Sequence, residues 1–195
     1  MDHTLYINLS DRTDRKEQVE HEFTQLNVPF ERVDAIAHFK GSIGCTLSHI
    51  KCVQMAKERN WSQVCGCEDD IMFTNPSLFK KNLELFLKSE IEWDVLLLGA
   101  NIAPPYQNIC PFCMQVYNAQ TTTGYIVKEH YYDTLLDNFR TSNQRPIDIH
   151  WKQLQQKDKW YILLPLTVVQ RPSYSNIENR MVNYTNAMLN TKTRS

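Results

Sequence analysis

The chain of 195 residues has no excess of basic residues, no acidic tail and no apolar run long enough to cross a bilayer. Its 21 Lys and Arg against 22 Asp and Glu give a formal net charge of -1, and the basic residues are spread along the chain. A nucleic-acid partner is therefore not expected. The first residues carry no basic region ahead of an apolar stretch. The sequence thus predicts no signal peptide, no transmembrane segment and a cytoplasmic location.

Short apolar segments alternate with amphipathic ones in the first half of the chain, and shorter, less regular segments follow. This pattern predicts an α/β fold whose sheet becomes mixed. We expect one domain over 1–180 and a polar C-terminal tail over 181–195. The expected strands include 4–9, 62–67, 93–98 and 123–127, and the expected helices include 11–26 and 45–60.

The most informative stretch is the acidic triplet Glu68-Asp69-Asp70, which follows an expected buried strand. A bare buried carboxylate costs several kcal/mol unless it is paired or bound to a metal. In open α/β sheets, the carboxyl ends of strands are where ligands bind. If the strand continued, Glu68 and Asp70 would share one of its faces. The triplet therefore predicts a site for a hard divalent cation and a phosphorylated substrate.

Six cysteines leave a second kind of metal site open. Cys65 and Cys67 together with Cys110 and Cys113 have enough thiolates to bind a zinc ion. Cys-x-Cys within a strand is not the usual zinc spacing, and the segment around Cys110 is expected to be a loop rather than a redox-active helix start. We therefore favour reduced, buried cysteines.

Several blocks along the chain resemble glycosyltransferase family 25, which includes lipooligosaccharide and collagen hydroxylysine galactosyltransferases. They occur in the family's order and extend from Leu5 to about Ile177. The blocks are Tyr6-Ile7-Asn8-Leu9-x-x-Arg12-x-x-Arg15, Arg32-Val33-Asp34-Ala35, Gly41-x-x-Gly44-Cys45-x-x-Ser48-His49, Glu68-Asp69-Asp70, Trp93-Asp94 with Gly99, Thr123-Gly124-Tyr125, Pro146-x-Asp148, and Gln170-Arg171-Pro172 with Ser175-x-Ile177.

The resemblance implies a GT-A fold, a Rossmann-like mixed sheet flanked by helices. It also implies an inverting transfer of a hexose, galactose or glucose first, from a UDP-sugar to a hydroxyl of a glycan or glycoprotein, assisted by Mn²⁺ or Mg²⁺. Asp70 would be the first metal ligand, Glu68 would be either the second ligand or a partner of the ribose, and His150 would be a third ligand. Asp148 would be the general base, and Asp69 would hold the sugar or cap the strand end.

Donor binding is expected around the ends of the first two strands and the block from Gly41 to His49. Arg12 and Arg15 suit a diphosphate, although both could instead be solvated charges on a helix. Asp34 could bind the uracil or ribose, or could cap a helix or turn. The expected donor-binding residues are Ile7, Asn8, Leu9, Arg12, Arg15, Asp34, Ser48, His49, Thr123 and Gly124.

Two other classes of function remain open at this point. A metal-dependent phosphohydrolase or nucleotidyltransferase would use the same carboxylates, but it predicts further acidic ligands close in sequence. The second class is a non-catalytic module. It would be either an interaction domain held together by zinc or a degenerate transferase that only binds nucleotide.

Overall fold

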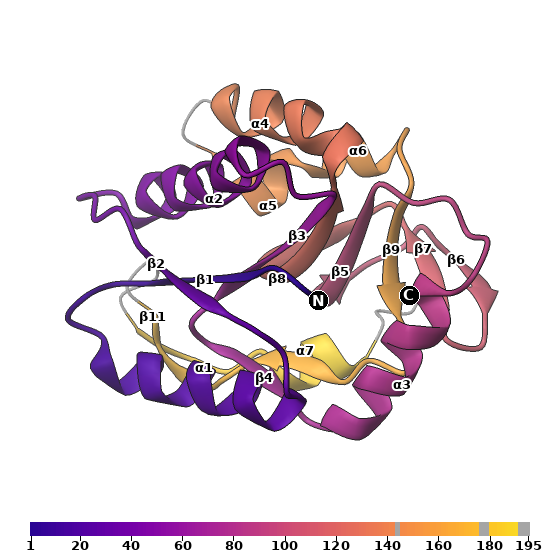
Figure 1. Cartoon of the computed structure of the whole chain (residues 1–195), viewed down its shortest axis with the longest axis horizontal. Coiled ribbons are helices and arrows are strands. Elements are labelled where there is room, and N and C mark those ends of the chain that lie inside the picture. The colour runs from indigo at the N-terminus through magenta and orange to yellow at the C-terminus, as the bar shows by residue number, and fades with distance from the viewer. Residues whose placement is uncertain (143–144, 176–179, 191–195) are drawn as a thin grey trace.

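The computed structural model describes residues 1–142, 145–175 and 180–190, so that Ile177 lies outside the described residues. Its central feature is an eight-stranded sheet with helices on both faces (Figure 1). The strand order is β2-β1-β3-β8-β5-β9-β7-β6. The bounds are β1 (Thr4–Asn8), β2 (Glu31–Asp34), β3 (Gln63–Glu68), β5 (Val95–Ile102), β6 (Tyr106–Cys110), β7 (Cys113–Val116), β8 (Ala119–Lys128) and β9 (Trp160–Leu163).

The strand directions place several strand ends at one edge of the sheet. β1 runs parallel to β2 and β3, and β9 runs parallel to β5. β8 lies antiparallel between β3 and β5. The carboxyl ends of β1, β2 and β3 therefore meet the beginning of β8 at the same edge. The predicted mixed α/β sheet is confirmed.

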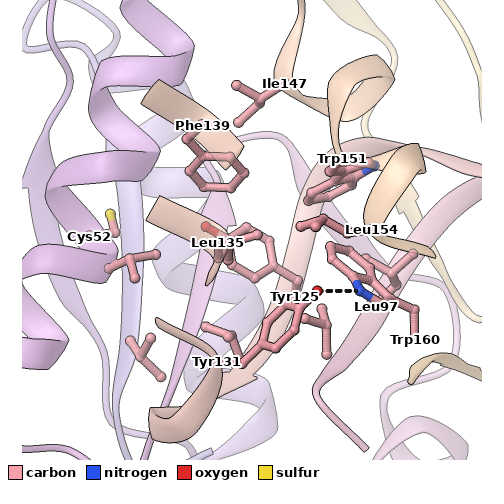
Figure 2. Close-up of a cluster of buried hydrophobic side chains, with 14 of the residues drawn as sticks. Cys52, Leu97, Tyr125, Tyr131, Leu135, Phe139, Ile147, Trp151, Leu154 and Trp160 are labelled. Carbon is pink, nitrogen blue, oxygen red and sulfur yellow. Dashed lines mark hydrogen bonds between the residues drawn. The ribbon is translucent and has the colours of Figure 1, made fainter. Parts of the chain in front are cut away.

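One face of the sheet is covered by α2 (Gly41–Glu58), α4 (Tyr132–Arg140), α5 (Ile147–His150) and α6 (Lys152–Gln155), with the short helix η1 (Glu129–Tyr131) before α4. Figure 2 shows the core on this side. The rings of Trp151 and Trp160 lie 5.1 Å apart, and Tyr125 meets Trp151 edge to face at 5.8 Å. Such aromatic pairs add about 0.5–1.5 kcal/mol each beyond their burial.

The other face is covered by α1 (Thr13–Leu26), α3 (Pro76–Leu87) and α7 (Thr185–Leu189). Phe23 of α1 and Phe79 and Phe86 of α3 are buried against the sheet there. The two apolar layers hold the sheet from both sides, which fixes the positions of its strand ends.

Two small antiparallel ladders bring the end of the chain back to the acidic triplet. β4 (Ile71–Phe73) pairs with β10 (Val168–Gln170), and β11 (Ser173–Ser175) pairs with β12 (Arg180–Val182). β3 ends at Glu68, and Asp69 and Asp70 form a turn before β4. The expectation that Glu68 and Asp70 share a strand face is therefore wrong, because the strand does not continue through the triplet.

Part of the expected polar tail is ordered in the fold. Of 181–195, the structure describes 181–190, which includes most of β12 and all of α7. Met188 is fully buried, and the backbone N–H of Gln170 donates to its sulfur at 3.2 Å. The division into a domain over 1–180 and a tail stays a prediction. Among the described helices, none has the length and apolar character needed to cross a membrane.

The cysteine pairs do not form a four-thiolate centre. The sulfurs of Cys65 and Cys67 lie 3.4 Å apart, and those of Cys110 and Cys113 lie 3.2 Å apart. The first pair is on β3, whereas the second closes the β6–β7 hairpin, with β8, β5 and β9 between β3 and β7. Four strand spacings of about 4.8 Å separate them. The zinc-stapled alternative thus lacks its ligand set.

Candidate active site

A cleft of about 930 Å³ opens at the edge where β1, β2 and β3 end. Its walls come from these strand ends, the segment before α2, the first turns of α2, and the returning residues Gln170 and Ser175. The predicted site residues that line it are Ile7, Leu9, Arg12, Arg15, Asp34, Ser48, His49, Glu68, Asp69 and Asp70.

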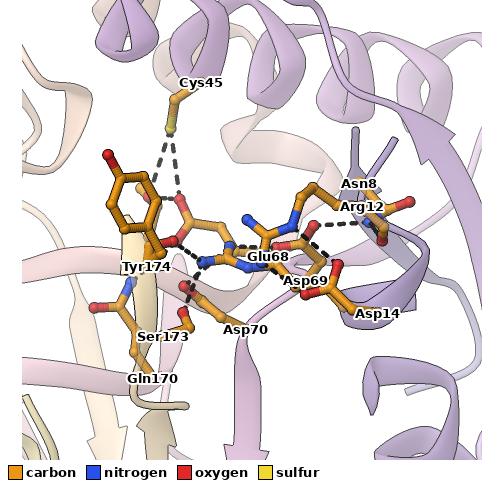
Figure 3. Close-up of polar contacts among 12 residues, drawn as sticks. Asn8, Arg12, Asp14, Cys45, Glu68, Asp69, Asp70, Gln170, Ser173 and Tyr174 are labelled. Carbon is orange, nitrogen blue, oxygen red and sulfur yellow. Dashed lines mark hydrogen bonds and ion pairs between the residues drawn. The ribbon is translucent and has the colours of Figure 1, made fainter. Parts of the chain in front are cut away.

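Glu68 ends β3 and is the centre of the polar contacts shown in Figure 3. Its Oε1 accepts from Thr122 Oγ1 at 2.6 Å and from Cys45 Sγ at 3.5 Å, and its Oε2 accepts from Gln170 Nε2 at 3.2 Å. Burial acts to raise the pKa of Glu68, but the neighbouring His49, Thr122 and Cys45 outweigh burial and lower it. Glu68 is therefore held as a carboxylate.

Asp69 is engaged at both carboxylate oxygens. Oδ2 accepts from Asn8 Nδ2 at 2.8 Å, and Oδ1 accepts from Arg15 Nη1 at 2.8 Å. Arg15 also donates to Ser173 Oγ at 2.7 Å and to the carbonyl of Tyr174 at 2.9 Å. Asp69 thus orients Arg15, which ties the acidic turn to β11.

The two carboxylate oxygens of Asp70 differ in their contacts among the described residues. Its Oδ1 is buried and has no hydrogen-bond partner among the residues that the structure describes, and its Oδ2 lies 3.6 Å from Arg15 Nη1. Burial, followed by repulsion from Glu68, raises the pKa of Asp70 to about 8. An orphaned buried oxygen beside a second carboxylate is the donor set that a hard divalent cation prefers. Asp70 and Glu68 therefore fit the expected cation.

His49 lies on α2 with its ring fully buried. Its Nδ1 lies 3.1 Å from the hydroxyl of Tyr125, and its Nε2 points to Glu68 Oε1 at 3.6 Å. The Tyr125 ring fits there because Gly66 lies beneath it: a Cβ at Gly66 would be 3.2 Å from the ring. Cys45, one helical turn before His49, also faces Glu68.

The other predicted donor residues have distinct surroundings. Arg12 pairs with Asp14 at 2.9 Å, and Asp34 pairs with Arg32 at 2.6 Å. The Ser48 hydroxyl donates to the carbonyl of Gly44 and accepts from a backbone N–H of the segment before α2, so it positions one wall of the cleft.

Asn8 lies behind the cleft lining rather than in it. Its side chain donates to Asp69 and to the carbonyl of Arg12, and accepts from Arg32 Nε at 3.0 Å. It joins β1 to the acidic turn and to β2.

Besides Asn8, four predicted residues are not among those that line the cleft: Thr123, Gly124, Asp148 and His150. His150 is at the end of α5, where its Nε2 lies 3.0 Å from Gln153 Nε2, and among the described contacts it makes no hydrogen bond with the triplet. Thr123 is buried and donates to Thr121. Gly124 serves packing, because a Cβ there would be 2.9 Å from the Ile71 side chain. Threonine 122, their neighbour, is the residue that reaches Glu68.

Asp148 lies at the beginning of α5, beside the start of β8. Its Oδ2 accepts from the backbone N–H of Thr121 at 3.1 Å. Burial is the largest cause, and it raises the pKa of Asp148. The hydrogen bond from the Thr121 N–H lowers this pKa and repulsion from Glu68 raises it, so that the pKa stays above its usual value. The Asp148 carboxyl group therefore loses its proton at a higher pH than an ordinary aspartate does.

Sequence reasoning did not assign Cys45, Thr122 or the segment from Ile36 to Phe39, all close to the site. The i, i+4 spacing of Cys45 and His49 was a usable signal, because residues at that spacing share a helix face. Phe39 lies at the cleft and is 89% exposed. No local pattern distinguished it from an ordinary loop residue.

The fold first defines a class of protein. The chain is similar to the crystal structure of a glycosyltransferase involved in the glycosylation of the major capsid of PBCV-1, with a TM-score of 0.57 and 10% identity. The match covers 97% of this chain and 89% of that one. At this identity the likeness concerns the fold alone. The expected GT-A type of fold is confirmed.

Two further similarities concern the sequence rather than the fold. The family model "Glycosyltransferase family 25 (LPS biosynthesis protein)" matches residues 38–108, which include the block from Gly41 to His49 and the acidic triplet. Procollagen galactosyltransferases 1-B and 1-A of Xenopus laevis are 26% and 25% identical over 130 residues. Each match covers 50% of this chain and 21% of the relative, so the chain spans about a fifth of their length. The resemblance to glycosyltransferase family 25 is confirmed.

Proposed function

We propose that this chain transfers a hexose, galactose or glucose, from a UDP-sugar to a hydroxyl of a glycan or glycoprotein, with inversion at the anomeric carbon and with the help of Mn²⁺ or Mg²⁺. The observation that carries the proposal is the buried Oδ1 of Asp70, which lies beside Glu68 at the cleft and has no hydrogen-bond partner within the described part of the chain. The similarity to galactosyltransferases over half of the chain supports the donor class.

Asp70 and Glu68 would hold the cation, and the cation would act as a Lewis acid on the departing diphosphate. The chain's own residues prepare the rest of the site. Thr122 and Gln170 fix the two oxygens of Glu68. Arg15, held by Asp69, supplies positive charge next to the acidic turn, and its planar fork of donors suits a phosphate.

The strand ends would bind the nucleoside. Ile7 and Leu9 flank the cleft at the end of β1, and Asp34 faces it from β2 with an exposed carboxylate. A carboxylate at this place accepts hydrogen bonds from ribose hydroxyls or from the uracil N–H. Arg12 lines the same part of the cleft.

The acceptor hydroxyl needs a base, and Asp148 is the carboxylate for that task. Its contact with Thr121 fixes it beside β8, whereas both oxygens of Asp69 are already engaged. Asp148 would take the acceptor's proton on a carboxylate oxygen as the new glycosidic bond forms. Asp69 is therefore a positioning residue in this proposal, and His150 has no part in it.

The first experiment is a thermal-shift panel of UDP, GDP, CDP and ADP, each with Mn²⁺ or with EDTA. A ligand at a hundred times its dissociation constant adds about 2.7 kcal/mol. At about 2–4 °C per kcal/mol for a chain of this size, the melting temperature should rise by roughly 5–11 °C. We expect this rise with UDP and Mn²⁺ together, and no comparable rise with EDTA.

Asp70→Asn should abolish the Mn²⁺-dependent rise with UDP while the fold is kept. The matched control is Asp137→Asn, the same change on the exposed face of α4, which should respond as the wild-type chain does. Unchanged UDP affinity of Asp70→Asn in Mn²⁺ would remove Asp70 from the cation site.

Product stereochemistry tests the transfer itself. With UDP-galactose or UDP-glucose and a hydroxyl acceptor, the anomeric proton coupling of the first-formed product should report inversion. Asp148→Asn should lower turnover at least a hundredfold with little change in UDP affinity, as expected for a base. A retained anomeric configuration would contradict the mechanism.

A further inference from the structure

A second constellation of ligand atoms lies next to the acidic turn, and the proposed transfer reaction does not use two of its three members. Cys45 and His49 extend from the same face of α2, one turn apart, towards Glu68 at the end of β3. The Cys45 Sγ, His49 Nε2 and Glu68 Oε1 atoms all lie within 4.8 Å of one another. All three residues line the cleft.

We propose that Cys45, His49 and Glu68 form a binding site for a thiophilic divalent cation, with Zn²⁺ as the best fit. A ligand set of one thiolate, one imidazole and one carboxylate is typical of zinc and too soft for Mn²⁺ or Mg²⁺. With three protein ligands, the fourth position of a tetrahedral ion would open into the cleft.

The distances suit such an ion. Zinc binds sulfur at about 2.3 Å and nitrogen or oxygen at about 2.0–2.2 Å, so tetrahedral ligand atoms lie roughly 3.4–3.6 Å apart. Cys45 Sγ lies 3.5 Å from Glu68 Oε1, and His49 Nε2 lies 3.6 Å from the same atom. Two edges of the ligand triangle therefore already have the required length.

An independent observation also points to a ligand. His49 is fully buried, yet its Nε2 has no hydrogen-bond partner among the described residues and is directed into the triangle. A buried polar atom without a hydrogen-bond partner is unfavourable, because nothing replaces the contact with water that it loses on folding. A cation bound there would satisfy this nitrogen.

The surroundings hold the ligands in place as outer partners of a metal site do. The Tyr125 hydroxyl meets His49 Nδ1 at 3.1 Å, so the other ring nitrogen is free to bind a metal. Thr122 donates to Glu68 Oε1 at 2.6 Å. The His49 ring is packed between Tyr125 and Phe139, which prevents it from turning away.

Zinc at this place would affect the proposed transferase, because both cations need Glu68. This consequence rests on the proposed function, whereas binding of Zn²⁺ itself does not. If both hold, Zn²⁺ should reduce the stabilisation by UDP with Mn²⁺, and the reduction should be smaller in Cys45→Ser.

The test is a titration of the chelator-treated chain with Co²⁺, which gives an intense thiolate-to-metal absorption band when a cysteine binds it, followed by displacement with Zn²⁺. We expect one equivalent of cobalt and a band that Zn²⁺ abolishes. Changes to outer partners of metal ligands cost 10–100-fold in affinity. Loss of a direct ligand in Cys45→Ser or His49→Gln should therefore cost at least about 100-fold, and Cys45→Ser should abolish the band.

Two controls separate this site from the others. Cys110→Ser removes a cysteine of the distant hairpin and should leave the titration unchanged. Asp70→Asn should also keep the band, although it is expected to lose UDP binding with Mn²⁺. Circular dichroism of each variant verifies the fold, and Cys45→Ala serves as a second removal of the thiol. Absence of a band in the wild-type chain, or a band that survives both Cys45 variants, would overturn the proposal without touching the transferase.

Discussion

The Glu22 side chain of α1 is expected to be among the most stabilising polar groups of this fold. It is 8% exposed, its Oε2 accepts from the backbone N–H of Phe73 at 3.0 Å, and its Oε1 accepts from Arg171 Nη2 at 2.5 Å. Arg171 in turn donates its backbone N–H to the carbonyl of Asp70 at 2.6 Å. Glu22 therefore joins α1, β4 and the end of β10 behind the acidic turn.

Glu22→Ala would leave the arginine without its charge partner and a buried backbone donor without an acceptor. Breaking a buried pair costs about 3–5 kcal/mol. Because the Arg171 side chain is 26% exposed and reaches water in part, we expect the lower end of that range, about 3 kcal/mol. At about 2–4 °C per kcal/mol, the melting temperature should fall by roughly 6–12 °C.

Urea denaturation of four chains measures this: wild type, Glu22→Ala, Arg171→Met and the double variant. The stability losses caused by mutating two residues in contact are not additive, and coupling energies of about 0.5–3 kcal/mol are usual. The double variant should therefore lose less stability than the two single losses added. Glu17→Ala, an exposed change on the same helix, is the matched control and should cost under about 0.5 kcal/mol.

The reasoning would be refuted if Glu22→Ala cost no more than Glu17→Ala, or if the two single losses added up in the double variant. Either result would mean that water replaces Glu22 in its contacts, so that burial of the carboxylate contributes nothing. A second readout is UDP binding with Mn²⁺, which should weaken in Glu22→Ala because Arg171 also supports Asp70.

Two further predictions concern the cleft. In Gly44→Ala, the new Cβ would be 2.4 Å from the carbonyl oxygen of Ile36, so the loop must move. Overpacking costs about 1–3 kcal/mol, whereas a helical Gly→Ala change regains about 1 kcal/mol. We therefore expect a small loss of stability in urea denaturation but a clear loss of UDP affinity. Unchanged UDP affinity would contradict this reasoning. The second concerns Asp70, whose folded pKa of about 8 is above its usual value, so that the folded chain keeps a proton that the unfolded chain releases. The free energy of unfolding without metal should then fall as pH rises from about 4 to 8. Urea titrations across this pH range should show a flatter slope for Asp70→Asn. An equal slope in both chains would contradict the raised pKa of Asp70.

Length and composition were sufficient to locate several strands and helices. The expected strand at 62–67 and helix at 45–60 correspond to β3 and α2. Apolar spacing did not give the buried face of α2, because Leu47 is exposed whereas Ser48 and His49 are buried. The strand expected at 123–127 was too short. It extends from Ala119 to Lys128 because β8 is paired on both sides, and its polar first half gave no strand signal.

The positions of site residues were predictable where the residues lie at a strand end. They were less predictable where contacts with distant parts of the chain determine which side chain reaches the cleft. Glu68, Asp69 and Asp70 lie at the cleft as expected, but the turn after β3 sends Asp69 to Arg15. The roles assigned to them stay predictions. Thr122 rather than Thr123 reaches Glu68, because successive residues of β8 point to opposite faces and Thr123 meets Thr121 on the other face. Which face lies towards Glu68 is set by pairing with strands distant in sequence.

The returning segment after β10 has a consequence for how the chain becomes competent to bind. Gln170 meets Glu68 across 102 residues, Arg171 meets Glu22 across 149, and Ser173 meets Arg15 across 158. Such long-range contacts form late, because a large loop must close before they contribute. During synthesis the first strands and helices can assemble long before the acidic turn has its final neighbours. Recognition of a donor is thereby coupled to completion of the whole fold, and a partly folded chain would present the carboxylates without the groups that orient them.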